Sequence, residues 1–264
     1  MTRIGIRAIG VLAPGLEGWA CARDVLAGRR AFEPGEVRPP PSPLLPPAER
    51  RRLNANSAWA LAVASEALDA AGDVERGRIA CVFATADGDG EVLAQSLDVL
   101  ASRPLALSPT LFHNSVFNAP SGYVSIAHGL TGPSTTICAG HRTLAMALAE
   151  CIDQVEAEAR AVLCVLVDTA YPGRLAALRA PVPSFACALL VEPAAAMATH
   201  GTLALAYDAT GSTPATAGVP PAVAAFFGDD TVSAALGLLA VVARGEPASA
   251  PLDARGSSAM RYTP

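Results

Sequence analysis

The sequence contains no lysine, and charged residues of every kind are scarce. All 19 basic residues are arginine, and charged residues make up 16% of the 264 residues, with a formal net charge of -5 at pH 7. An acidic chain has no general attraction for a phosphate backbone, so we expect no nucleic-acid partner. The densest basic cluster, residues 50–52, is interpreted as a solvated helix start, with contact to a partner protein as the alternative.

Long hydrophobic runs and paired cysteines are also missing. No run of about 18 consecutive apolar residues occurs, which excludes a membrane-spanning helix on the sequence alone. The cysteines lie singly among apolar residues without a C-x-x-C pair, and no secretory pattern precedes them. We therefore expect a cytoplasmic protein whose thiols are small buried hydrophobes, with no metal site and no cofactor. They are Cys21, Cys81, Cys138, Cys151, Cys164 and Cys187.

The acidic loop at residues 87–91, DGDGE, invites a metal or phosphate interpretation. It lacks the alternating ligands and distant Glu of a calcium loop, and no phosphate-binding G-K-[ST] follows it. Acidic residues are favourable near a helix N-terminus. The loop is therefore predicted to be a turn that opens a helix over residues 92–101.

Residues 104–141 contain no Asp, Glu, Lys or Arg, although the average of the chain would place about six charges there. Pro, Gly, Ser and Asn interrupt the segment every few residues, so it does not span a membrane. A stretch this free of charge is expected in a core or an interface.

The order of residues within this segment predicts a strand, a tight turn and a helix. Apolar spacing indicates a helix over residues 118–129, and the β-branched run 134–138 is typical of a buried strand. Small residues follow at 139–140, and helical spacing resumes over 142–157. Open α/β folds place their chemistry at the carboxyl ends of strands, where the turn residue is His141.

The same segment carries a family motif, N-x-x-x-G-x-x-S-I-x-x-G-L-x-G-P-S. Its residues are Asn118, Gly122, Ser125, Ile126, Gly129, Leu130, Gly132, Pro133 and Ser134. The motif resembles the β-ketoacyl synthases of fatty-acid and polyketide assembly, in which the catalytic cysteine follows the last glycine by nine residues. Here that count from Gly132 ends on His141. Cys138 lies three residues too early to replace the nucleophile.

Together, the alternation of strands and helices and the resemblance predict an α/β fold, the N-terminal half of a thiolase-like (ketosynthase) fold. We expect a mixed five-stranded sheet from segments near residues 4, 79, 134, 161 and 185, with helices on both faces. The ketosynthase-like domain is assigned to residues 1–207. Residues 208–264 are predicted to hold a Gly/Pro-rich connection, one apolar helix over 232–243 and a loose tail.

The missing cysteine argues against independent condensation activity. Condensation needs an acyl thioester on a thiolate, and an imidazole forms only a reactive acyl-imidazole. The resemblance also implies two catalytic histidines in a second half that this chain lacks. His141 is interpreted as a polar plug held by backbone groups, with an acid/base or acyl-handling role as the alternative.

The resemblance is closest to the short chain-length-factor-like subunits of aryl-polyene clusters. It implies a pseudoenzyme that pairs with a complete β-ketoacyl synthase, or with itself, contacts an acyl carrier protein only indirectly, and shapes the acyl tunnel. Bulky residues ahead of the motif helix are then the tunnel gate, with the first part of that helix in the interface. These tunnel and interface residues are Phe112, His113, Val116, Phe117, Asn118 and Tyr123.

Two alternatives stay open at this point. In the first alternative, Phe112 and Phe117 are ordinary core aromatics, since most aromatic side chains fill cores. In the second, the chain is a free-standing thioesterase or malonyl decarboxylase that uses His141 with His113.

Overall fold

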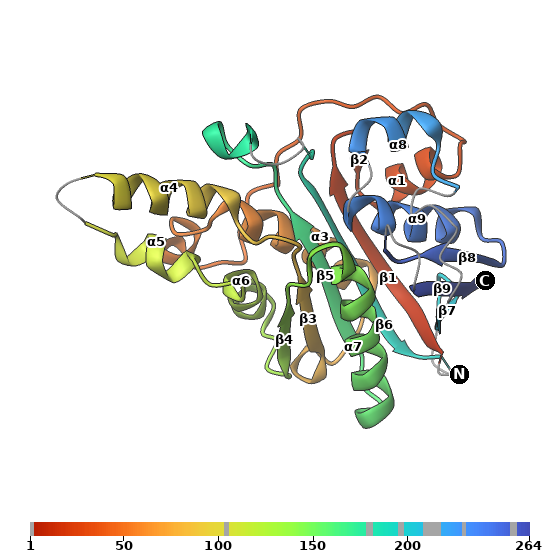
Figure 1. The fold of residues 1–264 in the computed structure, drawn as a ribbon. Helices are drawn as coiled ribbons and strands as arrows, with labels where there is room; N and C mark the ends of the chain where they lie inside the picture. Colours follow the sequence, from red (N-terminus) through yellow and green to blue (C-terminus); the bar gives the residue numbers. More distant parts are fainter. Residues whose placement is uncertain are drawn as a thin grey trace.

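In the computed structural model, which describes residues 3–102, 106–177, 182–194, 198–207, 218–228, 231–253 and 258–264, one mixed sheet runs through the molecule (Figure 1). Among these residues the sheet has nine strands in the order β4-β3-β5-β6-β1-β7-β9-β8, with β2 beside β1. The strands are β1 Ile4–Ala13, β2 Leu16–Glu17, β3 Ala80–Ala84, β4 Ser134–Ile137, β5 Val162–Asp168, β6 Phe185–Pro193, β7 Thr202–Tyr207, β8 Ala248–Pro251 and β9 Ser258–Thr263.

The predicted strands form one contiguous block, β4-β3-β5-β6-β1, which confirms the mixed α/β sheet. Strand β3 pairs in parallel with β4 and β5, whereas β6 is antiparallel to both β5 and β1. All residues of β5 are buried, as a continuously apolar strand requires when both faces of the sheet are covered.

The expected number of five strands is wrong, because the sheet continues past β1 through β7, β9 and β8. The loose tail is wrong for the same reason: β9 pairs antiparallel with β7 and buries Met260 and Tyr262. The boundary at residue 207 stays a prediction. Residues 208–217 of the expected connection lie outside the described residues.

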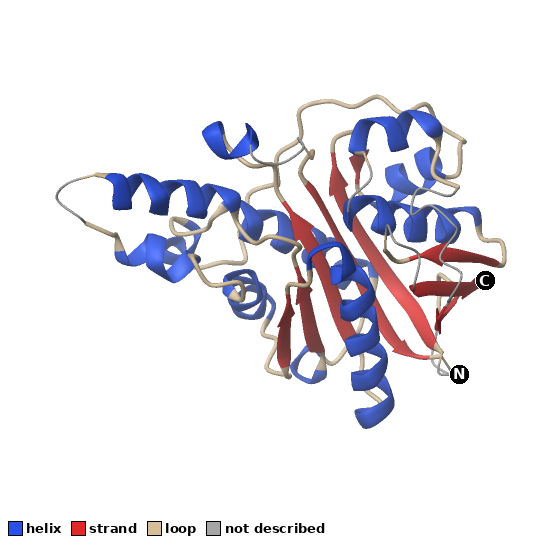
Figure 2. Cartoon of the chain, viewed as in Figure 1, coloured by secondary structure: helices blue, strands red, loops and turns tan. Residues whose placement is uncertain are grey.

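Helices cover both faces of the sheet, as predicted (Figure 2). On one face, α1, α7 and α9 pack over the apolar side chains of β1, β5 and β6, and on the other α3 and α6 do so. The helices are α1 Trp19–Leu26, α2 Pro47–Arg50, α3 Ala55–Ala70, α4 Gly90–Ala101, α5 Pro109–Asn114, α6 Ala119–His128, α7 Thr143–Glu158, α8 Pro221–Phe227 and α9 Thr231–Arg244, with short 3-10 turns η1 Arg76–Arg78, η2 Gly140–Arg142 and η3 Gly173–Ala177.

One helix over residues 48–71, which the apolar spacing favours, is divided in two by a turn after α2. Helix α3 begins only after Asn54, whose side-chain oxygen accepts a hydrogen bond of 3.0 Å from the backbone N–H of Ser57. Asn is a strong N-cap because it satisfies a backbone donor that the first turn leaves free. The cap thereby sets the position of Asn56 in the first turn of α3.

Helices α4 and α5 project away from the sheet beyond β4 (Figure 1). Helix α4 begins at the acidic loop, and the carboxylate of Asp89 accepts a 2.9 Å hydrogen bond from the backbone N–H of Val92. The predicted helix-opening turn is therefore confirmed. No helix in the described part of the chain is long and apolar enough to cross a membrane.

Candidate functional site: the elbow after β4 and the cavity beside α5

The segment from α6 to α7 has the predicted order of helix, strand, turn and helix. Helix α6 ends at Gly129, which adopts a left-handed conformation with φ of 65°. Strand β4 is the edge of the sheet and pairs with β3. Gly132 passes so close to the start of β3 that a Cβ there would lie 2.2 Å from the carbonyl oxygen of Ile79. The glycine of the motif is thus required by a backbone crossing.

His141 lies half-buried in η2, at the tip of the elbow between β4 and α7. The elbow backbone is tied on two sides: Ala139 donates its N–H to Oγ1 of Thr143 at 3.0 Å, and Oγ1 of Thr231 donates to the carbonyl of Gly140 at 3.1 Å. Within the described residues the imidazole itself has no hydrogen bond. The plug held by backbone groups is therefore not found there, although the position of His141 at the elbow is as predicted.

Cys138 is exposed, unlike the buried strand thiol that the sequence predicts, because it follows the last residue of the edge strand β4. Its thiol donates to the carbonyl of Ala86 at 3.2 Å. The pKa of Cys138 is raised, first by partial desolvation and then by the carboxylates of Asp87 and Asp168. A raised pKa keeps this sulfur protonated at neutral pH, which is the opposite of what a nucleophilic thiolate needs.

The buried carboxylate of Asp168 organises the end of β3. It accepts hydrogen bonds from Oγ1 of Thr85 at 2.8 Å and from the backbone N–H of Ala86 at 2.9 Å. Thr85 in turn accepts the N–H of Gly88 at 3.0 Å. These bonds fix the loop between β3 and α4, which forms one wall of the cavity described below.

The predicted gate residues lie at the surface. The exposed fractions are 66% for Phe112, 48% for Val116 and 53% for Phe117. The alternative that the two phenylalanines are core aromatics therefore does not hold in the isolated chain. His113 is also exposed and meets the ring of Tyr123 edge-on, with ring centroids 6.0 Å apart.

Of the two remaining interface residues, Tyr123 is buried and Asn118 is exposed. Tyr123 is 2% exposed, and its hydroxyl lies 3.1 Å from Oδ1 of Asn114 and 3.2 Å from the carbonyl of Arg52. Burial raises the pKa of Tyr123. Asn118 is exposed at the start of α6, where its carbonyl accepts from the hydroxyl of Ser121 at 2.8 Å.

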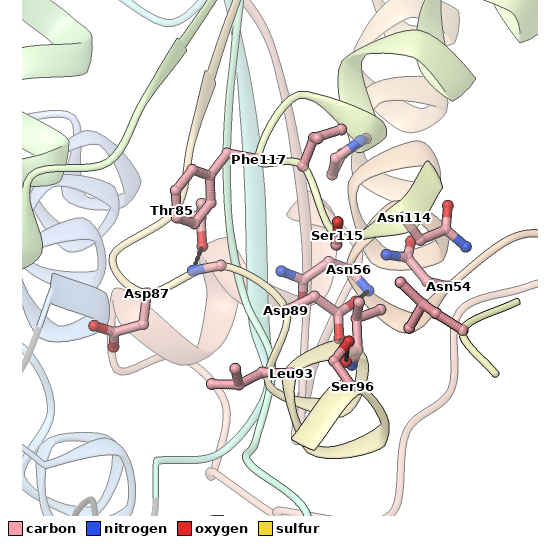
Figure 3. A pocket seen from close by; sticks show the side chains of 15 residues that line it. Asn54, Asn56, Thr85, Asp87, Asp89, Leu93, Ser96, Asn114, Ser115 and Phe117 are labelled. Carbon is pink, nitrogen blue, oxygen red and sulfur yellow. Dashed lines mark hydrogen bonds between the residues drawn. The ribbon is translucent and has the colours of Figure 1, made fainter. Parts of the chain in front are cut away.

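Two hollows meet at Val116. The larger, about 440 Å³, lies between the start of α3, the β3–α4 loop and the α5–α6 turn, and Phe117 forms part of its wall (Figure 3). The smaller, about 370 Å³, is bordered by His113, Asn118 and Tyr123. Five of the six predicted gate and interface residues therefore line these two adjoining hollows, whereas Phe112 lines neither. His141 borders neither hollow.

Asp89 and Asn56 are the residues of this region that sequence reasoning missed. Besides capping α4, Asp89 accepts the backbone N–H of Asn56 at 3.3 Å, so one carboxylate serves the first turns of two helices. The acidic loop signalled the cap of α4. Nothing in the local sequence signalled the second contact.

Most of the large exposed apolar side chains of the described residues lie on α4, α5, α6, the start of α7 and the segments on either side of α5. We call this set the apolar band. Its members are Leu93, Leu97, Leu100, Leu107, Phe112, Val116, Phe117, Ile126 and Met146. In the described residues, no group of three or more His, Cys, Asp or Glu side chains is arranged to hold a metal ion.

Comparison with known proteins places the chain in a family. The model of the β-ketoacyl synthase N-terminal domain matches residues 27–223. The chain belongs to the β-ketoacyl synthase family. No curated protein matches the sequence significantly.

Solved structures of ketosynthases share the fold. A ketosynthase (ApeO) in complex with its chain length factor (ApeC) from Xenorhabdus doucetiae matches with a TM-score of 0.74 and 22% identity, over 100% of both chains. The ishigamide ketosynthase/chain length factor matches with a TM-score of 0.73 and 16% identity, over 99% of both chains. A β-ketoacyl synthase from Burkholderia phymatum STM815 gives 0.61 and 17%, over 97% of this chain and 76% of the other. At these identities the likeness shows the thiolase-like fold of the ketosynthases.

Proposed function

We propose that this ketosynthase-family chain is a non-catalytic, chain-length-factor-like partner of a complete β-ketoacyl synthase in fatty-acid or polyketide biosynthesis of the aryl-polyene type. It pairs with the synthase as a cytoplasmic heterodimer, shapes the acyl tunnel, and meets the acyl carrier protein only through its partner. A pair of two copies of this chain is the alternative assembly.

The observation that carries the proposal is His141 at the elbow where the family places its nucleophile. An imidazole at that point forms only a reactive acyl-imidazole in place of a stable thioester, and Cys138, three residues earlier, has a raised pKa. The elbow is otherwise built as the family requires, with strand, turn and helix in place. A subunit that lacks the nucleophile but keeps the strand, turn and helix can still pair with a complete synthase.

The surface supports a permanent partner. The apolar band includes residues of the projecting α4 and α5 and of α6, and among the described residues β4 is an edge strand that pairs only with β3. An obligate interface buries roughly 2,000 Å² or more and is apolar at its centre. The apolar band and the edge strand together provide such a surface, with the gate residues inside it.

Co-expression with a complete β-ketoacyl synthase from the same genome tests the proposal. The untagged synthase is expected to purify with the tagged chain as a one-to-one complex by native mass spectrometry. Ile126→Arg puts a charge in the apolar band, at a side chain that is 56% exposed, and is expected to abolish the complex. Phe226→Arg, on the exposed face of α8, is the matched control and is expected to leave the complex intact. A chain that stays monomeric and fails to retain the synthase would contradict the pairing.

A further inference from the structure

The connection between α1 and α2 is rich in proline, with seven prolines in residues 34–47, and the proposed pairing uses none of them. Residues 31–42 lie in no helix, strand or turn, and residues 31–41 share no backbone–backbone hydrogen bond with another described residue. Proline fixes its own φ near −65° and pushes the residue before it to the extended region. The run of three prolines after Arg38 therefore directs this stretch to polyproline II, a helix without internal hydrogen bonds.

Burial along this stretch repeats every three residues, which is the period of a polyproline II helix. One edge of the helix, Pro39 and Ser42, is half-buried. The residues at positions 38, 40, 41 and 43 are exposed. The stretch therefore turns one edge toward the body of the chain and presents two edges to solvent, Arg38 with Pro41 and Pro40 with Pro43.

Packing at both ends holds the connection in place. At one end the ring of Phe32 meets those of Phe226 and Phe227 on α8, with centroids 5.5 and 6.2 Å away. At the other end a turn buries Leu45, which is 1% exposed, in the core on the α3 side of the sheet. In Figure 1 the connection is the orange trace along the top of the molecule. A segment that is already extended and anchored loses little conformational entropy when a partner binds it.

The exposed edges carry the chemistry that an aromatic groove recognises. Residues 40–43, P-P-S-P, form a P-x-x-P pattern, and Arg38 precedes it. The Arg38 side chain is 82% exposed and pairs with Glu36, which is 76% exposed, so water screens this ion pair and Arg38 can exchange it for another carboxylate. Leu44 follows and is 50% exposed. Among the described residues, Leu44 and Phe226 are the large exposed hydrophobic side chains outside the apolar band.

We propose that residues 38–43 are a docking ligand for a protein with an aromatic-lined groove and an acidic rim, the groove chemistry of SH3 and WW domains. Aromatic rings of the groove pack on the exposed proline rings, and groove N–H and O–H groups donate to the open backbone carbonyls. A carboxylate at the rim pairs with Arg38. The contact is small, so this partner binds reversibly, unlike a permanent subunit. The ligand lies outside the apolar band, so its partner and the synthase can be bound together.

Two domains with aromatic-lined grooves, one SH3 domain and one WW domain, serve as probes. Each isotope-labelled domain is titrated with the unlabelled full chain and followed by NMR. We expect a saturable shift of the groove tryptophan N–H in at least one domain. The double variant Pro40→Ala/Pro41→Ala removes a proline ring from each exposed edge and is expected to weaken binding about tenfold or more. Arg38→Ala is expected to weaken it about two- to fivefold, the size of one exposed ion pair.

Matched variants keep the test decisive. Pro34→Ala and Arg50→Ala, exposed positions outside the ligand, should leave the affinity unchanged. If the double proline variant does not fold, Arg38→Ala decides alone, because an exposed side chain contributes little to the core. Ile126→Arg, which breaks the proposed pairing, should still bind the groove, so the two proposals fail separately. No groove shift in either domain up to about 1 mM chain, or full affinity in both ligand variants, would overturn the docking ligand.

Discussion

Replacing Phe117 by alanine separates a gate residue from an ordinary packing residue. The Phe117 ring is 53% exposed, and its covered side lies on the β3–α4 loop, where a Cβ at Gly88 would come within 2.5 Å of the ring. Complete burial of a Phe side chain contributes about 1.5 to 3 kcal/mol, and about half of the ring is covered here. Phe117→Ala should therefore lower the free energy of unfolding of the isolated chain by roughly 1 kcal/mol, well below the 3 to 5 kcal/mol typical of a core Phe→Ala change.

In the complex with a ketosynthase, the same substitution is expected to open space at the end of the acyl tunnel. The products released from the reconstituted system, measured by mass spectrometry, should shift to longer chains while the complex stays one-to-one. Phe226→Ala is the matched control, since Phe226 is also a partly exposed aromatic, 38% exposed, but lies on α8 away from both hollows. It should leave product length unchanged.

Two outcomes would refute this reasoning for Phe117. An unchanged product profile from an intact complex would show that the ring does not limit the chain. A loss of 3 kcal/mol or more in urea unfolding of the isolated chain would show that Phe117 is a core residue, contrary to its exposure.

Two other predictions concern the scaffold around the motif. Burial and the neighbouring Arg76 guanidinium, which donates to Nδ1, hold the pKa of His128 below its usual 6.5, so the unfolded chain takes up the proton first. The free energy of unfolding should therefore fall as the pH drops below about 6.5, and it should fall less steeply in His128→Gln. Equal pH slopes of the two proteins in urea titrations would contradict this. Gly132→Ala places a Cβ 2.2 Å from the carbonyl oxygen of Ile79 and should lower the free energy of unfolding by about 1 to 3 kcal/mol. Gly35→Ala is the control, since the space around the added carbon is open, and it should change the free energy of unfolding by less than about 0.5 kcal/mol. Equal urea midpoints for the two variants would exclude the backbone crossing as the reason for the motif glycine.

The parts of the fold that were predictable carry local signals. Asn118 and Gly129 bound α6 as the sequence predicts, and the glycine ends the helix by adopting a left-handed conformation. The strand, turn and helix around His141 follow from residue spacing in the same way. Strand β9 could not be foreseen, because its pairing with β7 joins Tyr262 to Leu203 and short strands far apart in sequence give no periodic signal.

The candidate site was predictable only in part. Counting from Gly132 located His141 without any structure. The contact between Asp89 and Asn56, in contrast, exists only because Asn54 sets the start of α3 and so brings the Asn56 N–H to a carboxylate 33 residues away. The exposure of Phe112 and Phe117 likewise depends on where α5 and its following turn lie against the sheet. Composition alone was equally consistent with these two rings lying in a core.

The rate of acyl-thioester condensation by the one-to-one complex, with and without His141→Ala, tests the central claim most directly. If this chain is a non-catalytic partner, the His141→Ala complex condenses at the rate of the unsubstituted complex, and the chain alone turns over neither acyl nor malonyl thioesters. A fall of about a hundredfold or more in the variant, the size expected for loss of a general acid or base, would contradict the claim and assign the chemistry to His141.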